Sequence, residues 1–168
     1  QPEELIKPDI PFLGTENSSL RPAAAGAIKS LFERARQEGF NLIGVSAYRS
    51  YQYQKEVFAR HVNRLGEKEA KTISAPPGAS EHQTGLVIDV SSPQVNYKLT
   101  QRFGRTKAGH WLKENAPEFG FIIRYPQGAR EITGYQYEPW HLRYVGPTHA
   151  QLISQKEITL EEYMYVNY

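Results

Sequence analysis

The middle of the chain reads Ser80-Glu81-His82-Gln83-Thr84-Gly85-Leu86-Val87-Ile88-Asp89, which predicts a turn that leads into a buried strand. Gly85 and the β-branched residues after it favour this interpretation over a helix. His82 then lies on the loop before the strand, and Asp89 ends the strand. The loop must fold back across the strand for both side chains to reach one ion, and Gly85 permits such a bend.

A second short motif lies near the end of the chain and reads Glu138-Pro139-Trp140-His141. Pro139 restricts Glu138 to an extended conformation. Side chains three apart on a straight strand point to opposite faces, so a bend at Pro139 has to aim Glu138 and His141 inward together. We expect Trp140 to pack against the protein and to fix this bend.

Together the two motifs offer the ligands of a catalytic zinc ion. Such a site uses three protein ligands and leaves the fourth position for water. The predicted ligands are His82, Asp89 and His141, with Glu138 placed over the water as the general base. The neighbouring Glu81 is expected to point away from His82 and to have no role. The other histidines have no partner at metal spacing and are interpreted as structural or solvent-facing: His61, His110 and His149.

The rest of the chain predicts an α+β fold, in which helices pack around an antiparallel sheet that holds the zinc site. Pro22 suits the first turn of a helix, and Ser50 can cap a second one. An irregular lead-in over residues 1–20 precedes one domain over residues 21–168. Helices are expected at about 22–39, 50–65, 101–115, 149–154 and 160–165, strands at 42–45, 86–90, 121–124 and 141–145, and a connector at 66–78.

Length and composition set further bounds on the function. The 168 residues suit a single domain, and the absence of cysteine excludes disulfides and thiolate metal sites. The net charge is only +2 without a basic patch, which gives no support for nucleic-acid binding. No apolar run approaches the roughly 20 residues needed to span a membrane, and no signal peptide is recognisable.

Both motifs resemble those of the zinc D-Ala-D-Ala carboxypeptidases related to the vancomycin-resistance carboxypeptidase. The family pattern Ser-x-His-x-x-Gly-x-x-x-Asp, followed by Glu-x-Trp-His, stands unbroken here. Within that group the chain is most similar to the L,D-carboxypeptidases that trim peptidoglycan tetrapeptides. Residues 46–50 with Gln54 resemble the segment that anchors the substrate, and residues 120–126 and 131–134 also fit. The similarity runs from about Arg21 to Tyr163.

The resemblance implies a zinc L,D-carboxypeptidase that removes the C-terminal D-alanine from tetrapeptide stems of peptidoglycan. The alternative is a D,D-carboxypeptidase that acts on D-Ala-D-Ala pentapeptide stems. Arg49 is placed in the substrate pocket, where its planar guanidinium suits a terminal carboxylate or the developing oxyanion. The resemblance adds Gln54, Ser80 and Tyr125 as further substrate contacts. It also implies a monomer in the bacterial cell envelope, outside the cytoplasm, whose signal or anchor segment is absent from this chain.

Two other classes of protein share some of these features. A non-catalytic wall-binding domain could have the same fold, but binding alone needs no base, and Glu138 is intact. An iron oxygenase also uses two histidines and one carboxylate. That site normally belongs to a β-rich jelly roll, which the three strong helix signals argue against.

Overall fold

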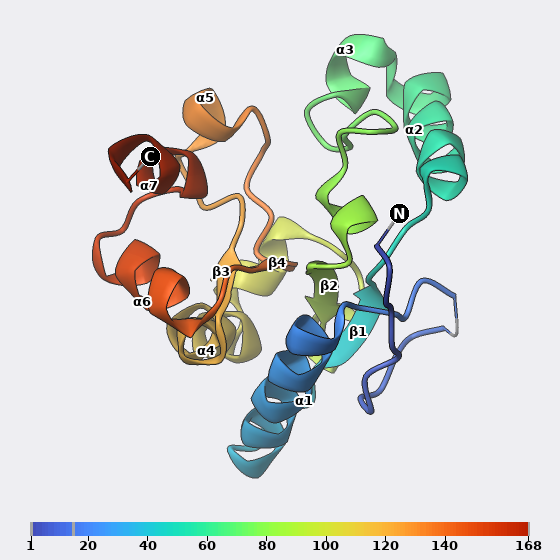
Figure 1. Ribbon diagram of the computed structural model, residues 1–168. Helices are drawn as coiled ribbons and strands as arrows, with labels where there is room; N and C mark the ends of the chain where they lie inside the picture. The colour runs from blue at the N-terminus through green and yellow to red at the C-terminus, as the bar shows by residue number, and fades with distance from the viewer. Residues whose placement is uncertain (1, 15, 168) are drawn as a thin grey trace.

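A four-stranded antiparallel sheet lies at the centre of the computed structural model, which describes residues 2–14 and 16–167. Its strands are β1 (Ile43–Ser46), β2 (Val87–Ser91), β3 (Phe121–Ile123) and β4 (His141–Tyr144), in the order β1-β2-β4-β3. Helices surround the sheet (Figure 1), so the predicted α+β class is confirmed. Gln1 and Thr15 of the expected lead-in, and Tyr168 at the end of the expected domain, lie outside the described residues.

One face of the sheet forms the hydrophobic core. Ile88, Val90 and Leu142 are fully buried there, because alternate side chains of a strand point to the same face. They pack in one cluster with the apolar faces of α1 (Pro22–Gln37) and α4 (Lys107–Asn115), both of which lie on that side in Figure 1. The opposite face of β2 and β4 is therefore left to carry polar side chains.

Two groups of helices stand apart on the side of that polar face (Figure 1). One is α2 (Tyr51–Leu65) with the short α3 (Glu67–Ala70). The other comprises α5 (Arg130–Thr133) and α7 (Leu160–Asn167), next to α6 (Pro147–Gln155). The Ser50 hydroxyl accepts the backbone N–H of Tyr53 at 3.1 Å, so the predicted cap of α2 is present. No helix among the described residues has the length and apolar character needed to cross a membrane.

The lead-in packs along the free edge of β1. The backbone N–H of Leu13 donates to the carbonyl of Gly44 at 2.8 Å, and the N–H of Gly44 donates to Pro11 at 2.9 Å. The ring of Phe12 lies where a side chain at position 44 would be, which explains why a glycine stands there. These contacts cover the hydrogen-bonding groups of an edge strand.

Three predicted details were wrong. The helix expected over 101–115 is interrupted, because the Thr106 hydroxyl accepts the backbone N–H of Gly109 at 3.0 Å and starts α4 afresh after the 3₁₀ turn Gln101–Arg105. Asp89 lies inside β2 rather than at its end, since the strand continues to Ser91. The connector at 66–78 contains the short helix α3.

The two helical glycines Gly26 and Gly109 should respond oppositely to replacement by alanine. A Cβ at Gly26 in α1 meets nothing, so Gly26→Ala should raise the free energy of unfolding by about 0.5–1 kcal/mol through helix propensity. A Cβ at Gly109 in α4 would meet the backbone carbonyl of Phe103, so Gly109→Ala should lower the free energy of unfolding by roughly 1–3 kcal/mol. Urea unfolding of both variants tests this, and equal effects would contradict the placement of α4.

Candidate metal centre

His82 is held rigidly above the polar face of the sheet. It lies in the 3₁₀ turn Glu81–Thr84, which Gly85 ends in the left-handed conformation at φ 71°. The ring nitrogen Nδ1 lies 2.7 Å from the carbonyl oxygen of Ala47, and the side chain is almost fully buried. Since only a protonated Nδ1 can donate to that carbonyl, Nε2 carries a lone pair and faces Asp89 at 3.4 Å. The chain bends at Gly85, as predicted, and this brings His82 back over the strand that carries Asp89.

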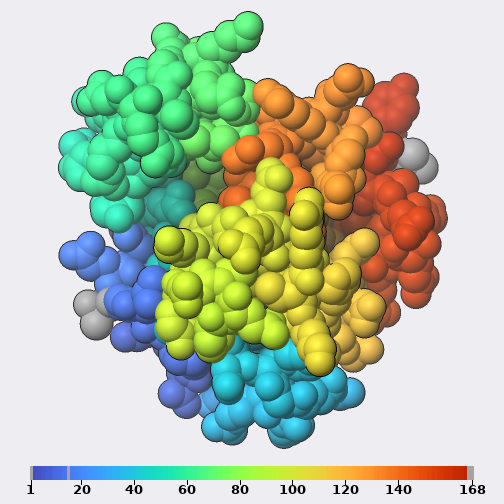
Figure 2. Space-filling view, turned by 180° about the vertical axis from the view of Figure 1, so that it is seen from behind, coloured from blue at the N-terminus to red at the C-terminus, as the bar shows by residue number. Residues whose placement is uncertain are grey.

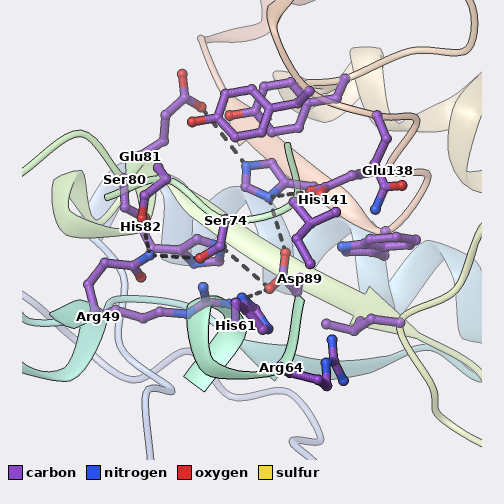
Figure 3. Close-up of a pocket in the computed structure, with 18 residues that line it drawn as sticks. Arg49, His61, Arg64, Ser74, Ser80, Glu81, His82, Asp89, Glu138 and His141 are labelled. Carbon is purple, nitrogen blue, oxygen red and sulfur yellow. Dashed lines mark hydrogen bonds and ion pairs between the residues drawn. The ribbon is translucent and has the colours of Figure 1, made fainter. Parts of the chain in front are cut away.

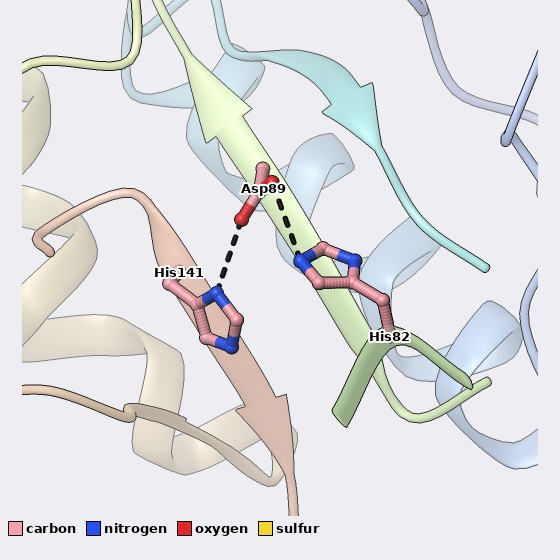
Figure 4. A group of neighbouring side chains, drawn as sticks. All are labelled: His82, Asp89 and His141. Carbon is pink, nitrogen blue, oxygen red and sulfur yellow. Dashed lines mark ion pairs between the residues drawn. The ribbon is translucent and has the colours of Figure 1, made fainter. Parts of the chain in front are cut away.

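Asp89 and His141 are direct cross-strand partners of β2 and β4, so they share one face of the sheet. Asp89 Oδ1 lies 3.2 Å from His141 Nδ1, while Oδ2 faces His82 (Figure 4). The two imidazole rings meet edge to face with their centroids 5.0 Å apart. Nitrogen and oxygen atoms of the three residues lie within 4.8 Å of one another, which makes them the candidate metal ligands among the described residues.

Apart from Arg49 Nη2, which donates to Asp89 Oδ2, the atoms that converge here can present lone pairs, and this fits a bound cation. The His82 lone pair faces a carboxylate oxygen, and the buried Asp89 Oδ1 accepts no hydrogen bond from residues 2–14 or 16–167. Two nitrogens and one carboxylate oxygen match the ligands of a catalytic zinc site, which keeps one position open. A buried set of facing acceptors is unfavourable unless a cation lies between them.

The electrostatic environment favours the protonation states in which His82 and Asp89 can bind a metal. Burial lowers the pKa of His82 to about 4, assisted by the charge of Arg49. Burial alone would raise the pKa of Asp89, but His82, His141 and Arg49 outweigh it and hold that pKa well below its ordinary value. Near neutral pH His82 is therefore neutral and Asp89 is ionised, which are the states that bind a metal.

Glu138 reaches the same centre from the turn that precedes β4. The backbone N–H of His141 donates to the carbonyl of Glu138 at 3.1 Å, which closes the turn around Pro139. Glu138 Oε2 then lies 3.6 Å from His141 Nδ1, beside the candidate ligands rather than among them. Burial raises the pKa of Glu138 to about 7, although His141 opposes this shift. A carboxyl group with such a pKa is suited to exchanging protons near neutrality.

Arg49 is anchored by the protein itself. Its Nη2 donates to Asp89 Oδ2 at 2.7 Å, and its Nε donates to Ser46 Oγ at 2.9 Å. These bonds orient the guanidinium and leave Nη1 without a partner among the described residues. Sequence reasoning expected a group held at the pocket edge, but it did not foresee the ion pair with a candidate ligand.

A cavity of about 280 Å³ opens at the candidate metal centre and is lined by Arg49 and by the other three predicted substrate contacts, Gln54, Ser80 and Tyr125. Figure 3 shows Arg49 and Ser80 in this cavity, beside the candidate ligands. Gln54 is fully buried, and its Nε2 donates to the carbonyl of Ala75 at 2.8 Å and to Ser74 at 3.3 Å. Its Oε1 has no hydrogen-bond partner within the part of the chain that the structure describes. Figure 2 shows the molecular surface hollowed between the green region of α2 and α3 and the orange region near α5.

Several residues of the cavity were not singled out by the sequence. Ser74 lies beside Gln54, and Tyr135 stacks on Tyr125 with the ring centroids 4.5 Å apart. His61 lines the cavity from α2, although the sequence predicted no role for it. His110 is exposed on α4, and His149 Nδ1 lies 2.7 Å from the hydroxyl of Tyr163. Nothing in the spacing of Ser74, Tyr135 and His61 along the chain indicates that they meet at this cavity.

Glu81 is the clearest departure from the sequence analysis. Its Oε1 accepts from Arg124 Nε at 2.8 Å and lies 3.2 Å from Arg143 Nη1, while Oε2 faces His141 Nε2 at 4.0 Å. Burial would raise the pKa of Glu81, but the two arginines outweigh it, and the pKa lies below its ordinary value. Sequence reasoning expected only that Glu81 points away from His82, and it did not foresee these partners.

Comparison with known proteins gives a coherent result. A family model described as VanY, D-alanyl-D-alanine carboxypeptidase, matches residues 17–147. The YodJ protein of Bacillus subtilis (strain 168) is 47% identical over 166 residues, which cover 97% of this chain. The chain spans 61% of the length of that relative.

Solved structures of similar proteins share the fold throughout. The LdcB LD-carboxypeptidase has a TM-score of 0.92 and 46% identity, and the match covers 98% of this chain and 78% of that one. A variant of the vancomycin-resistance D,D-pentapeptidase VanY, in complex with Zn(II), has a TM-score of 0.78 and 33% identity. That match covers 93% of this chain and 90% of the other.

The geometry predicts about one zinc ion per chain, bound by His82, Asp89 and His141. His82→Ala or His141→Ala removes one of three ligands and should abolish stoichiometric zinc binding. His61→Gln, His110→Gln and His149→Gln are the matched controls, and each should retain the wild-type zinc content. Metal analysis of purified proteins checks this, and full occupancy in both alanine variants would refute the assignment.

Proposed function

The chain belongs to the VanY family of D-alanyl-D-alanine carboxypeptidases, and we propose that it is a zinc-dependent carboxypeptidase of peptidoglycan. Its preferred reaction is the release of the C-terminal D-alanine from tetrapeptide stems, which makes it an L,D-carboxypeptidase. It acts as a monomer in the bacterial cell envelope. The observation that carries this proposal is the position of Glu138 beside, and not within, the set of three metal ligands.

The residues of the centre divide the work of peptide hydrolysis. His82, Asp89 and His141 would hold a zinc ion, which would supply a Lewis acid for the scissile carbonyl and for a water nucleophile. Glu138 accepts a proton from that water and delivers it to the departing amine. A pure binding domain would have no use for a buried carboxyl group at this point, because it only adds a desolvation cost.

Substrate positioning falls to polar groups that line the same cavity. Arg49 is oriented by Asp89 and Ser46, so its free Nη1 can donate to the terminal carboxylate or to the developing oxyanion. Ser80 and the hydroxyl of Tyr125 can add hydrogen bonds to the same end of the substrate. The unpartnered Oε1 of Gln54 suits a substrate N–H, since it can only accept.

The choice between L,D and D,D substrates rests on similarity. The high structural similarity to the LdcB LD-carboxypeptidase favours the tetrapeptide. The second candidate is a D,D-carboxypeptidase acting on pentapeptide stems, and the similarity to the D,D-pentapeptidase VanY favours it. Both reactions use the same metal centre and the same base, so the difference lies in how the penultimate residue is accommodated.

Replacing the base should separate chemistry from binding. Glu138→Gln keeps the size of the side chain and removes its ability to accept a proton. It should lower kcat by at least about 10²-fold, with zinc content and substrate affinity near the wild-type values. Single-turnover kinetics and metal analysis on the same protein check this. A variant that turns over at the wild-type rate would show that Glu138 is not the base.

The substrate preference is tested with purified muropeptides. We expect a higher kcat/KM for D-alanine release from tetrapeptide than from pentapeptide, measured by mass spectrometry of the products. Tetrapeptide amidated at its C-terminus is the control and should resist cleavage, since Arg49 loses its carboxylate partner. A higher kcat/KM on pentapeptide would assign the D,D activity. Equal cleavage of the amidated tetrapeptide would contradict carboxypeptidase action altogether.

A further inference from the structure

Two buried polar atoms behind the metal centre face each other, and neither has a hydrogen-bond partner among the described residues. They are Nε2 of His141 and Oε2 of Glu81, 4.0 Å apart. Figure 3 shows the Glu81 carboxylate on the side of the His141 ring that faces away from Asp89. A shift of about 1 Å would bring the two atoms to an ordinary N–H···O distance.

The chemistry of His141 requires an acceptor at this place. Its Nδ1 faces Asp89 and Glu138, so this nitrogen must present a lone pair when it ligates a metal. The ring proton then resides on Nε2, which is buried away from solvent. A buried N–H group without an acceptor is unfavourable, and Glu81 is the carboxylate that lies opposite it.

Glu81 is itself held in the orientation that this role needs. Both arginines, Arg124 and Arg143, bind its Oε1, which leaves Oε2 directed at His141. Arg124 is fixed in turn by a bidentate pair with Glu161 of α7, at 2.6 and 2.9 Å. The carboxylate therefore has little freedom to turn away from the ring.

We propose that Glu81 is a positioning residue of the metal centre, which accepts the Nε2–H of His141 and so fixes the tautomer and orientation of this ligand. The turn 81–84 then supplies one ligand, His82, and the outer partner of another. In His82 the nitrogen that does not face Asp89, Nδ1, has the backbone carbonyl of Ala47 as its partner instead of a carboxylate. Outer partners of this kind commonly change metal affinity by 10- to 100-fold. The inference rests on the metal-binding part of the proposed function and not on its substrate.

The test measures zinc affinity of the full chain by competition with a chromogenic chelator, without substrate. In Glu81→Gln the arginines should attract the amide oxygen, which turns the amide NH₂ towards the N–H of His141. We therefore expect at least a tenfold weaker zinc affinity, and a similar loss in Glu81→Ala. Glu131→Gln removes an exposed carboxylate on α5 and should bind zinc as tightly as wild type.

A merely structural role for Glu81 is separated by Glu161→Gln. This variant weakens the outer ion pair of Arg124 and should lower the stability of the metal-free protein, yet change zinc affinity less than threefold. Unchanged zinc affinity in Glu81→Gln would overturn the proposal. The proposal would also be overturned if Glu81→Gln and Glu161→Gln both lost zinc affinity in proportion to their loss of metal-free stability.

A measurement on the wild type keeps the test valid even if the variants fold poorly. In the zinc-loaded protein, NMR should show a slowly exchanging, downfield Nε2–H of His141, and a rapidly exchanging signal would contradict the proposal. Wild type that binds zinc tightly without cleaving muropeptides would refute the proposed activity and leave this inference standing. Wild type that binds no zinc would refute the metal centre and this inference with it.

Discussion

The pairing of Asp89 with His141 across β2 and β4 is the constraint on which the rest of the site depends. The next pair along the same strands is Ile88 with Leu142, and both side chains are fully buried in the core. A slip of one residue would exchange the two faces and place the carboxylate in the core. The hydrophobic residues therefore hold the register, and the register brings the candidate ligands together.

Around this pair the protein accumulates buried charge that a purely structural core would avoid. Asp89 is balanced by Arg49, and Glu81 by Arg124 and Arg143. Glu138 forms no ion pair with an arginine among the described residues, and burial raises its pKa to about 7. Burying polar groups is unfavourable unless they are paired. Local features that reduce stability are expected at functional sites, where the chemistry requires them.

The departures from sequence-based expectation have identifiable causes. The break before α4 involves the hydroxyl of Thr106, which caps the new helix. The same local sequence would also allow Thr106 to lie on the surface of one continuous helix, so the sequence does not distinguish the two. Glu81 was assigned no role because neighbours in a turn point in different directions. Its arginine partners, Arg124 and Arg143, are distant in sequence, and so is Glu161, which binds Arg124 rather than Glu81. These residues meet only through the packing of β3, β4 and α7.

The sequence by itself determined the α+β class, most helices and strands, and the residues expected to form the metal centre. It could do so because hydrophobic periodicity, caps and the types of metal-ligating residues are local properties. Only the tertiary structure decided which atoms meet: the orientation of both imidazoles, the ion pair of Arg49 with Asp89, and the carboxylate of Glu81 behind His141. Such contacts join strands, turns and helices far apart along the chain, so they follow from strand register and packing, which no short segment encodes alone.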